Sequence, residues 1–345
     1  MQAFGASICS VSIMGGGVMS DSNPLMKVKD VKVWFGIRRG LFGKTVYVKA
    51  VDGVSLEIGK GESVAVVGES GSGKTTLGKT VLRLYKPISG EIYYDGKRID
   101  NLEEEELKWY RREAQIIYQD PFGSLNPFFT VERILSEPLT IHGISKDYKV
   151  TKQMIDQILT DVKLEPPDMF ASKHPHMLSG GQRQRVAIAR AMILKPKLIV
   201  ADEPVSMLDA SVRVEIMSLL RSLQEKYKTS FLYITHDLAT IKYFSQTLYI
   251  MYAGKIIESG PTRDVLKEPL HPYTQALVSA IPDPNPDNKN KFRNVPAGEP
   301  PSSITPPSGC RFHPRCPRFI SGKCDVVEPQ LLRVKSRDVA CHLYS

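Results

Sequence analysis

Short runs of β-branched and aromatic residues alternate with longer helical patterns along most of the chain. Strand-like runs occupy residues 28–35, 54–58, 63–67, 198–201 and 229–234. Helical patterns follow at residues 74–84 and at about 211–226. Because strands that alternate with helices pair side by side in one direction, the pattern predicts a mostly parallel α/β core.

Proline and glycine divide the rest of the chain. From about residue 120 to 195 the pattern becomes helical, with prolines at 127, 138, 166, 167 and 175 as breaks. Asp95-Gly96 predicts a hairpin turn between short strands, and residues 36–46 form a predicted basic loop. Proline and asparagine dominate residues 282–309, which predicts an extended linker before a small cysteine-containing segment, 310–345.

Composition and charge narrow the class of protein. No window approaches the roughly 20 apolar residues that cross a bilayer, and the first 19 residues lack the basic start and apolar core of a secretory signal. We therefore expect the chain to stay in the cytoplasm and to reach a membrane only through a partner. The net charge of +9 is compatible with binding to nucleic acid or to anionic lipid. However, the sequence contains no basic stripe with interleaved aromatic residues, which nucleic-acid binding would favour.

A glycine-rich loop follows the predicted strand at 63–67. Residues Gly68, Glu69, Ser70, Gly71, Ser72, Gly73, Lys74 and Thr75 match the phosphate-binding pattern G-x-x-x-x-G-K-[ST], and Thr76 continues it. The glycines let backbone N–H groups turn toward phosphate oxygens at the start of a helix. Lys74 is expected at the β- and γ-phosphates and Thr75 at Mg²⁺, so the sequence predicts an ATP–Mg²⁺ site.

Polar residues also follow three other predicted strands. Asp202 is expected to hold Mg²⁺, and its neighbour Glu203 to act as general base on the attacking water. The alternative for these two acids is a helix-capping pair before a proline. His236 is expected to contact the γ-phosphate and the water, and Gln119 the Mg²⁺ or the water, because ligands bind at the carboxyl edge of such sheets.

A second phosphate-binding turn lies about a hundred residues after the first. Ser179, Gly180, Gly181 and Gln182 open a predicted helix and suit a γ-phosphate. On a separate helical lobe this turn cannot reach the nucleotide of its own chain, which predicts head-to-tail pairing with a similar chain. For the adenine ring Tyr47 is the candidate stacking partner, with Trp34, Phe35 and Phe42 as competitors.

Together these residues resemble the ATP-binding-cassette (ABC) ATPases over about residues 27–262. Gly68–Thr75 looks like Walker A, 198–203 like Walker B, 178–182 like the signature motif, Gln119 like the Q-loop, 206–209 like the D-loop and His236 like the switch histidine. The resemblance implies an α/β P-loop NTPase fold with a RecA-like core, an antiparallel β subdomain and a helical subdomain at about 120–190. It implies ATP hydrolysis and adds Asp209 to the nucleotide-binding residues. Met207 departs from the usual alanine and is expected to alter only packing.

Other segments narrow the resemblance to one subfamily. Residues 118–127, 271–277 and 309–317 resemble ATPases of oligopeptide/dipeptide permeases, and 38–42 resembles their second, F-type subunit. This implies a flexible segment at 1–26, a C-terminal extension at 263–345, and peripheral location at the cytoplasmic face of the cell membrane. The implied partners are a sister ATPase in a heterodimer, two membrane permease subunits and an external substrate-binding protein. The implied cargo is oligopeptides or dipeptides, with oligosaccharides as the alternative.

Four cysteines of the extension suggest a shared ligand set. Cys310, Cys316, Cys324 and Cys341 give the spacing C-x5-C-x7-C-x16-C, which lacks the paired C-x2-C of common zinc sites. A [4Fe–4S] cluster, Zn²⁺ and disulfides remain open from the spacing. The resemblance favours the [4Fe–4S] cluster, whose negative charge Arg311, Arg315 and Arg318 would offset.

Two other classes of function are weighed against the importer. A soluble ABC ATPase acting on nucleic acid would have a long coiled coil between the phosphate motifs, and Thr75 to Leu178 is too short for one. Ribosomal types carry two cassettes per chain, whereas this sequence has one. A regulatory module without turnover is disfavoured by intact Glu203 and His236. Met19 and Met26 are both plausible true starts.

Overall fold

The computed structural model describes residues 23–38, 45–281 and 298–345. The expectations about residues 1–22, about residues 39–44 of the basic loop and about most of the proline-rich stretch lie outside the described residues. Within the described ranges, no helix combines the length and the apolar character that crossing a bilayer requires.

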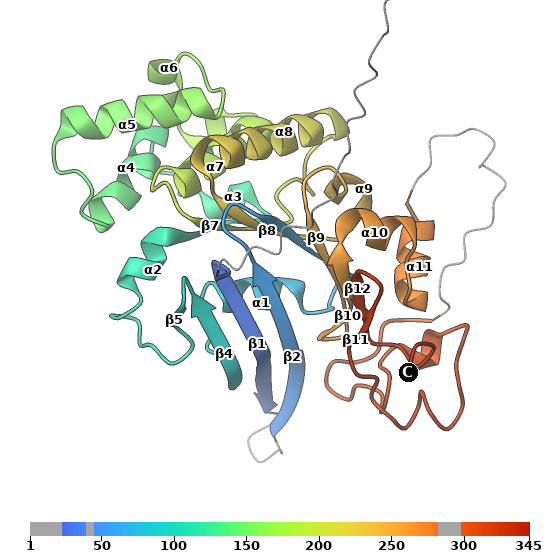
Figure 1. Ribbon diagram of the computed structural model, residues 1–345. Helices are drawn as coiled ribbons and strands as arrows, with labels where there is room; N and C mark the ends of the chain where they lie inside the picture. The colour runs from blue at the N-terminus through green and yellow to red at the C-terminus, as the bar shows by residue number, and fades with distance from the viewer. Residues whose placement is uncertain (1–22, 39–44, 282–297) are drawn as a thin grey trace, which may run out of the picture.

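Two sheets organise the chain (Figure 1). The strands are β1 (Met26–Arg38), β2 (Thr45–Ile58), β3 (Ser63–Val67), β4 (Ser89–Tyr94), β5 (Lys97–Arg98), β6 (Ala114–Ile117), β7 (Leu198–Asp202), β8 (Ser230–Thr235), β9 (Thr247–Tyr252), β10 (Lys255–Pro261), β11 (Leu332–Val334) and β12 (Arg337–Val339). One sheet has the order β2-β1-β4-β5, and the other has the order β11-β12-β10-β9-β3-β8-β7-β6.

Helices connect and cover these sheets. They are α1 (Lys74–Val81), α2 (Lys108–Glu113), α3 (Pro121–Ser124), α4 (Val131–Ile141), α5 (Tyr148–Asp161), α6 (Pro167–Ala171), α7 (Gly180–Met192), α8 (Ala210–Tyr227), α9 (Leu238–Ile241), α10 (Thr262–Lys267) and α11 (Pro272–Ser279). Short 3₁₀ turns lie at Pro175–Met177 and His313–Arg315. Figure 1 shows α4, α5 and α6 grouped on the side of the molecule opposite the C-terminal strands.

The centre of the larger sheet is parallel, as the sequence pattern predicts. Strands β6, β7, β8, β3 and β9 run in one direction. Every residue of β3 and β7 is buried, which explains why both strands are uninterrupted apolar runs rather than alternating ones. Because parallel strands share a carboxyl edge, the residues that follow β3, β6, β7 and β8 meet at one edge of the sheet.

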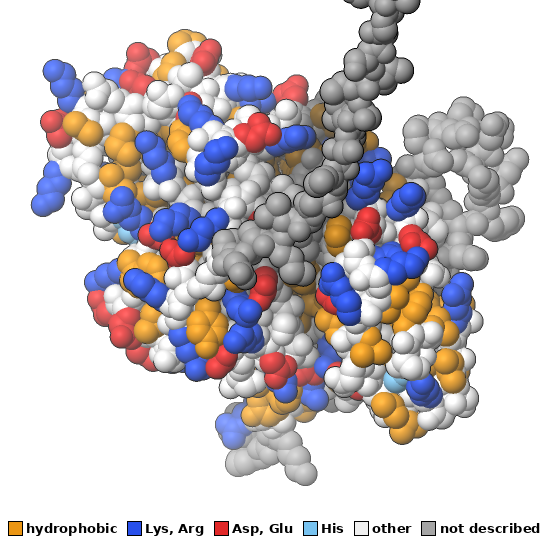
Figure 2. All heavy atoms as spheres, in the orientation of Figure 1, with side chains coloured by type: hydrophobic (Ala, Val, Ile, Leu, Met, Phe, Trp, Pro, Cys, Tyr) orange, Lys and Arg blue, Asp and Glu red, His pale blue; other side chains and the backbone are white. Residues whose placement is uncertain are grey.

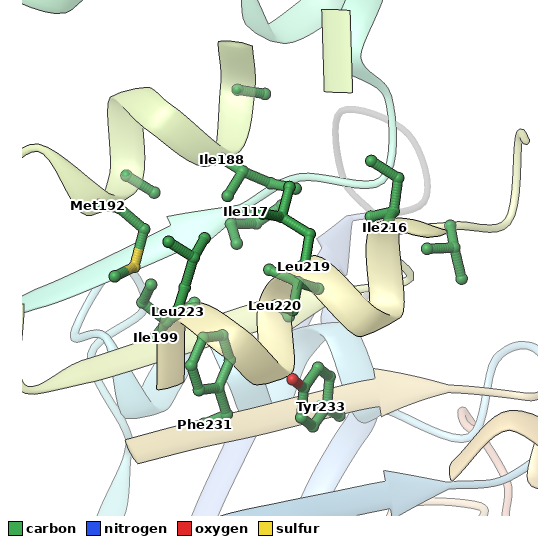
Figure 3. Close-up of a cluster of buried hydrophobic side chains, with 14 of the residues drawn as sticks. Ile117, Ile188, Met192, Ile199, Ile216, Leu219, Leu220, Leu223, Phe231 and Tyr233 are labelled. Carbon is green, nitrogen blue, oxygen red and sulfur yellow. The ribbon is translucent and has the colours of Figure 1, made fainter. Parts of the chain in front are cut away.

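Helices α7 and α8 cover one face of this sheet. Figure 3 shows their apolar side chains directed toward Phe231 and Tyr233 of β8 and Ile199 of β7. The contributing residues of α8 are Ile216, Leu219, Leu220 and Leu223, all buried and spaced three or four apart. This helical periodicity places one continuous apolar face against the strands and so holds the carboxyl edge in place.

The smaller sheet confirms one turn prediction and corrects two strand boundaries. Asp95 and Gly96 join β4 to β5 with φ values of 46° and 79°, the left-handed backbone that a two-residue hairpin requires. The strand predicted at 54–58 is the end of the longer β2, and residues 36–38 continue β1 rather than form a loop. Pairing of Gly36 with Tyr47 and of Arg38 with Thr45 explains the extra length.

The C-terminal segment joins the larger sheet. Strand β12 pairs antiparallel with β10, with Glu258 opposite Val339, and β11 pairs with β12. Figure 1 shows this segment beside β10 and α11. On the face drawn in Figure 2, acidic and basic side chains are interspersed, and apolar side chains gather over the C-terminal segment.

Candidate functional site

The loop between β3 and α1 is closed around its lysine. Lys74 is buried, and its ammonium group donates hydrogen bonds to the carbonyl oxygens of Gly68 and Glu69, each at 2.8 Å. Burial lowers the pKa of Lys74, while the charges of Glu203, Asp202 and Glu69 act to raise it. The loop therefore presents a desolvated cation beside a ring of backbone N–H groups, which suits a polyphosphate.

Two glycines of this loop are required by close backbone contacts. A Cβ on Gly68 would lie 2.0 Å from the carbonyl oxygen of Met251 in β9. A Cβ on Gly73 would lie 2.0 Å from the carbonyl oxygen of Ala50 in β2, and Gly73 also has a φ of +103°. The loop is thus pressed between two strands, so only glycine fits at these positions.

Oxygen donors suitable for Mg²⁺ meet where β7 ends beside α1. The Thr75 hydroxyl donates a hydrogen bond to Asp202 Oδ1 at 3.0 Å. Burial raises the pKa of Asp202 and the neighbouring Glu203 charge adds to this, whereas the Thr75 hydrogen bond opposes it. Hydroxyl and carboxylate oxygens are the ligands Mg²⁺ takes beside substrate phosphates and water, so these residues fit the ion.

Glu203 lies between the ends of two neighbouring strands. Its Oε2 accepts a hydrogen bond from Gln119 Nε2 at 3.2 Å, and its Oε1 lies 3.0 Å from His236 Nδ1. The Glu203 backbone has a φ of +46°, and its N–H donates to the carbonyl oxygen of Ile234 in β8 at 2.8 Å. This strained backbone directs the carboxylate toward the loop instead of into a helix cap, against the capping alternative.

These groups border one open cavity of about 670 Å³. Its lining residues are Val48, Ala50, Gly68, Glu69, Ser70, Gly71, Gly73, Lys74, Thr75, Thr76, Gln119, Glu203, His236, Leu277 and Ser303. A cavity of this size accommodates a small-molecule ligand such as a nucleotide. The structure therefore brings the predicted loop and the predicted base together in one place.

Several predicted residues are absent from this lining, among them Tyr47, Ser72 and Asp202, of which Asp202 reaches the site through its hydrogen bond with Thr75. Tyr47 is absent from the cavity lining, is 51% exposed, and has its ring 6.4 Å from that of Trp34. Ser72 is buried beneath the loop and its hydroxyl has no hydrogen-bond partner among the described residues. Val48 and Ala50, which follow Tyr47 in β2, line the cavity instead. The stacking role of Tyr47 stays a prediction.

The second phosphate-binding turn lies apart from this cavity, with Ser179 exposed and residues 180–182 half-buried. Ser179 caps α7: its hydroxyl accepts from the Gln182 N–H, and the Gln182 side chain accepts from the Ser179 N–H. None of residues 179–182 lines the cavity of its own chain. Asp209 is the N-cap residue of α8 and likewise lies outside that lining. This placement is what pairing with a second chain requires.

Sequence reasoning missed the contribution of the C-terminal segment. Leu277 of α11 and Ser303 line the cavity, and the Ser303 carbonyl oxygen accepts from the Lys49 N–H at 2.9 Å. Arg315 pairs with Glu69 at 2.9 Å, and Arg311 pairs with Asp52. From the sequence alone, both arginines are expected to offset the charge of a cluster. Their acidic partners lie far away in the sequence, so no local pattern reveals these contacts.

The four cysteines of the segment carry free thiols. Burial raises the pKa of Cys310 to about 11, and the charges of Cys341, Cys324 and Cys316 add to this. The Cys310 N–H donates to the Cys324 carbonyl oxygen at 2.8 Å. Across the described ranges, no three His, Cys, Asp or Glu side chains are grouped closely enough to hold a metal ion.

Comparisons with known proteins agree with this geometry. A family model described as "ABC transporter" matches residues 51–206, and one described as "Oligopeptide/dipeptide transporter, C-terminal region" matches residues 257–324. The putative oligopeptide transport ATP-binding protein YkfD of Bacillus subtilis is 44% identical over 323 residues, covering 93% of this chain and 96% of the relative. The dipeptide transport ATP-binding protein DppF of Escherichia coli is 41% identical, covering 92% and 94%.

A solved structure shares the fold. The dimeric post-hydrolysis state of the ATP-binding cassette MJ0796 with ADP and phosphate aligns with a TM-score of 0.61 and 31% identity. The alignment covers 69% of this chain and 99% of that one, so part of this chain has no counterpart there. The aligned part of this chain therefore shares the fold of a cassette whose structure contains ADP and phosphate. The rest of this chain lies outside the alignment.

Proposed function

The chain belongs to the ABC transporter ATP-binding subunits of the oligopeptide/dipeptide type, and from this premise we propose that it hydrolyses ATP to power peptide uptake through a membrane permease. The observation that supports this best is the convergence of Gln119, Glu203 and His236 on the cavity that the phosphate-binding loop borders. A carboxylate held between an amide and an imidazole beside a phosphate site is an arrangement for directing water at phosphorus.

Each of these residues has a defined task in the proposed reaction. Lys74 and the loop N–H groups hold the β- and γ-phosphates, after Lys74 exchanges its two carbonyl partners for phosphate oxygens. Glu203 accepts the proton of the attacking water, and His236 keeps the carboxylate directed at that water. Thr75 and Asp202 would hold Mg²⁺, which supplies positive charge to the phosphate oxygens as negative charge develops there.

Completion of the site requires a second chain. The separation of residues 179–182 from the cavity of their own chain supports head-to-tail pairing, in which this turn and Asp209 contact the partner's nucleotide. The related cassette MJ0796 is itself dimeric in its post-hydrolysis structure. For this chain we propose a heterodimer with a sister ATPase, seated on two permease subunits and served by an external substrate-binding protein. Its location would be peripheral, at the cytoplasmic face of the membrane.

Pairing can be tested by crosslinking the chain to its co-purified sister ATPase. Ser179 is exposed, so a Ser179→Cys variant can be combined with a sister chain that carries an added cysteine in its own phosphate-binding loop, and the pair treated with a short thiol crosslinker in the presence of ATP. We expect a crosslinked species of the two chains that exceeds the background from the native cysteines and that is lost when either added cysteine is omitted. Equal crosslinking with and without the added cysteines would contradict the head-to-tail arrangement.

Peptide cargo is supported by the names of the relatives, which describe oligopeptide and dipeptide transport, and by the matched C-terminal region. The alternative oligosaccharide cargo receives no support from those names. Purification of the chain with its membrane partners, followed by vesicle reconstitution, tests the proposal. ATP hydrolysis should rise when the external receptor is loaded with peptide. Stimulation by an oligosaccharide and not by peptides would overturn it.

For the four cysteines we propose a [4Fe–4S] cluster. Support comes from the four free thiols and from the hydrogen bond of the Cys310 N–H to the Cys324 carbonyl oxygen, which joins two of these residues. Four thiolates are the ligand set of such a cluster. Anaerobic purification with iron and sulfide assays tests this, and Cys324→Ser should lower the iron content. Protein that is free of iron and loaded with zinc would contradict it.

A further inference from the structure

Glu69 is an acidic residue within a loop that must bind an anion. It is the one carboxylate in the sequence Gly68–Thr75, and it borders the cavity. Its charge is close enough to act on the pKa of Lys74. An uncompensated carboxylate at this place would repel the phosphates of a nucleotide, so its neutralisation matters for the known reaction.

Arg315, from the four-cysteine segment, provides that neutralisation. Its Nη1 lies 2.9 Å from Glu69 Oε2 and its Nη2 lies 3.3 Å from Glu69 Oε1, a two-bond pairing of guanidinium and carboxylate. The Arg315 side chain is 8% exposed and the Glu69 side chain 27% exposed. Because both groups are largely shielded from water, their mutual attraction is weakly screened.

Side chains of α11, β9 and the four-cysteine segment lie together at the start of the loop. The Glu69 N–H donates to the hydroxyl of Tyr273 at 2.9 Å, and Arg315 Nη1 donates to the hydroxyl of Tyr252 at 3.3 Å. The ring of Phe312 packs at 5.3 Å from that of Tyr252 and at 5.4 Å from that of Tyr273. An aromatic cluster thus lies under the loop, and Arg315 is fixed on top of it.

We propose that Arg315 is a positioning residue of the nucleotide site, which neutralises Glu69 at the entrance of the phosphate-binding loop. The four-cysteine segment then contributes a residue, Arg315, to the ATP site of the same chain. This inference deepens the proposed ATPase function and rests on it. A loss or rearrangement of the segment would change nucleotide affinity through the Arg315–Glu69 ion pair, although none of the four cysteines lines the cavity.

Titration of the full chain with ADP and Mg²⁺, which bind without turnover, tests the proposal. Arg315→Ala should weaken ADP binding about tenfold, because an unpaired carboxylate then faces the phosphates. Arg315→Lys should recover most of the affinity. Arg333→Ala is the matched control, since Arg333 belongs to the same segment and pairs with Asp338 on the surface. Its affinity should stay within about twofold of the wild-type value.

A double variant separates charge neutralisation from simple support of the fold. Glu69→Gln alone should bind ADP within about twofold of wild type, and Glu69→Gln with Arg315→Ala should match it, since no charge remains to compensate. A double variant as weak as Arg315→Ala would overturn the proposal, and so would wild-type affinity in Arg315→Ala. If Arg315→Ala does not fold, Arg315→Gln, which retains hydrogen-bonding capacity, replaces it in the same comparison.

The ATPase function and the role of Arg315 can fail separately. Wild-type protein that does not bind ADP would overturn the proposed ATPase function. Wild-type protein that binds ADP, together with an Arg315→Ala variant that binds it equally well, would overturn only the role of Arg315. The melting temperature of each variant, measured in the same buffer without nucleotide, identifies any general loss of folding.

Discussion

Glu203 Oε1 lies 3.0 Å from His236 Nδ1, and the two residues follow adjacent parallel strands, β7 and β8. The Glu203 side chain is 17% exposed, whereas the His236 side chain is 60% exposed. The carboxylate is therefore held at the wall of the cavity while the imidazole faces the open space in front of it. This asymmetry is what the proposed roles require, with Glu203 as the proton acceptor and His236 at the transferred phosphoryl group.

Replacement of Glu203 by glutamine should stop turnover and keep nucleotide binding. The amide cannot accept the proton of the attacking water, so we expect phosphate release to slow by about 100-fold or more. ATP-bound dimers should accumulate and be visible by size-exclusion chromatography. Glu225→Gln, on the exposed side of α8, is the control and should hydrolyse ATP normally. Normal turnover in Glu203→Gln would remove Glu203 from the mechanism.

Replacement of His236 by alanine removes the imidazole partner of Glu203 without touching the loop. We expect the maximal rate of ATP hydrolysis to fall by about 100-fold, because the water and the carboxylate lose their orientation. The dissociation constant for ADP should change little, since Lys74 and the loop N–H groups remain. A large loss of ADP affinity at an unchanged rate would instead make His236 a ground-state binding residue.

Replacement of Gly180 by alanine separates nucleotide binding from pairing. The added Cβ would lie 3.8 Å from Leu208 Cδ2, an ordinary contact, so the chain should fold as the wild type does. Because the methyl group occupies the exposed turn that meets the partner's phosphate, hydrolysis should fall at least about tenfold while ADP binding to the isolated chain is retained. Unchanged hydrolysis would show that the turn does not contact a γ-phosphate.

His271 predicts the pH dependence of stability. It is buried, its Nδ1 accepts from the Tyr273 N–H at 3.0 Å, and burial lowers its pKa from 6.5 to about 3. Below pH 6.5 the His271 imidazole is protonated in the unfolded chain, whereas in the folded chain it stays neutral until the pH approaches 3. The stability due to the neutral ring is therefore complete above pH 6.5 and is lost as the pH falls toward 3. At pH 5 the loss should be about 2 kcal/mol.

Urea denaturation of the wild type and of His271→Asn, at pH 7.5 and pH 5, measures this contribution. Asparagine can accept the same hydrogen bond at the start of α11 but does not titrate. We expect the free energy of unfolding to fall by about 2 kcal/mol more in the wild type than in the variant. An equal fall in both proteins would show that His271 is not the responsible group.

The sequence predicted the catalytic edge well because its chemistry is local. Each of Gln119, Asp202 and His236 ends or follows a strand, and parallel strands bring such residues together regardless of the intervening chain. The helix bounds around α8 and the turn at Asp95-Gly96 follow from periodicity and turn chemistry in the same way. Consistency between local pattern and tertiary fold explains this success.

The contacts that sequence reasoning missed depend on packing between distant segments. Arg315 and Glu69 are separated by 246 residues, and no periodicity links them. Arg315 stands among several arginines near cysteines, so its sequence neighbours suggest a different role. For Tyr47, the alternation of side chains along β2 places its neighbour Val48 in the cavity lining, and the stacking role of Tyr47 stays a prediction. The presence of an aromatic residue in a strand does not determine which face of the sheet its side chain lies on.

Pairing of β12 with β10 has a consequence for how this protein can be dissected. If the chain were shortened to the length of its solved relatives, β10 would become an edge strand. Its unpaired backbone N–H and C=O groups could then pair with strands of other molecules. Leu270 would lose its contacts with Val339 and Cys341 at the same time. We therefore expect the C-terminal segment and the ATPase core to unfold together, and truncated chains to aggregate instead of folding as separate enzymes.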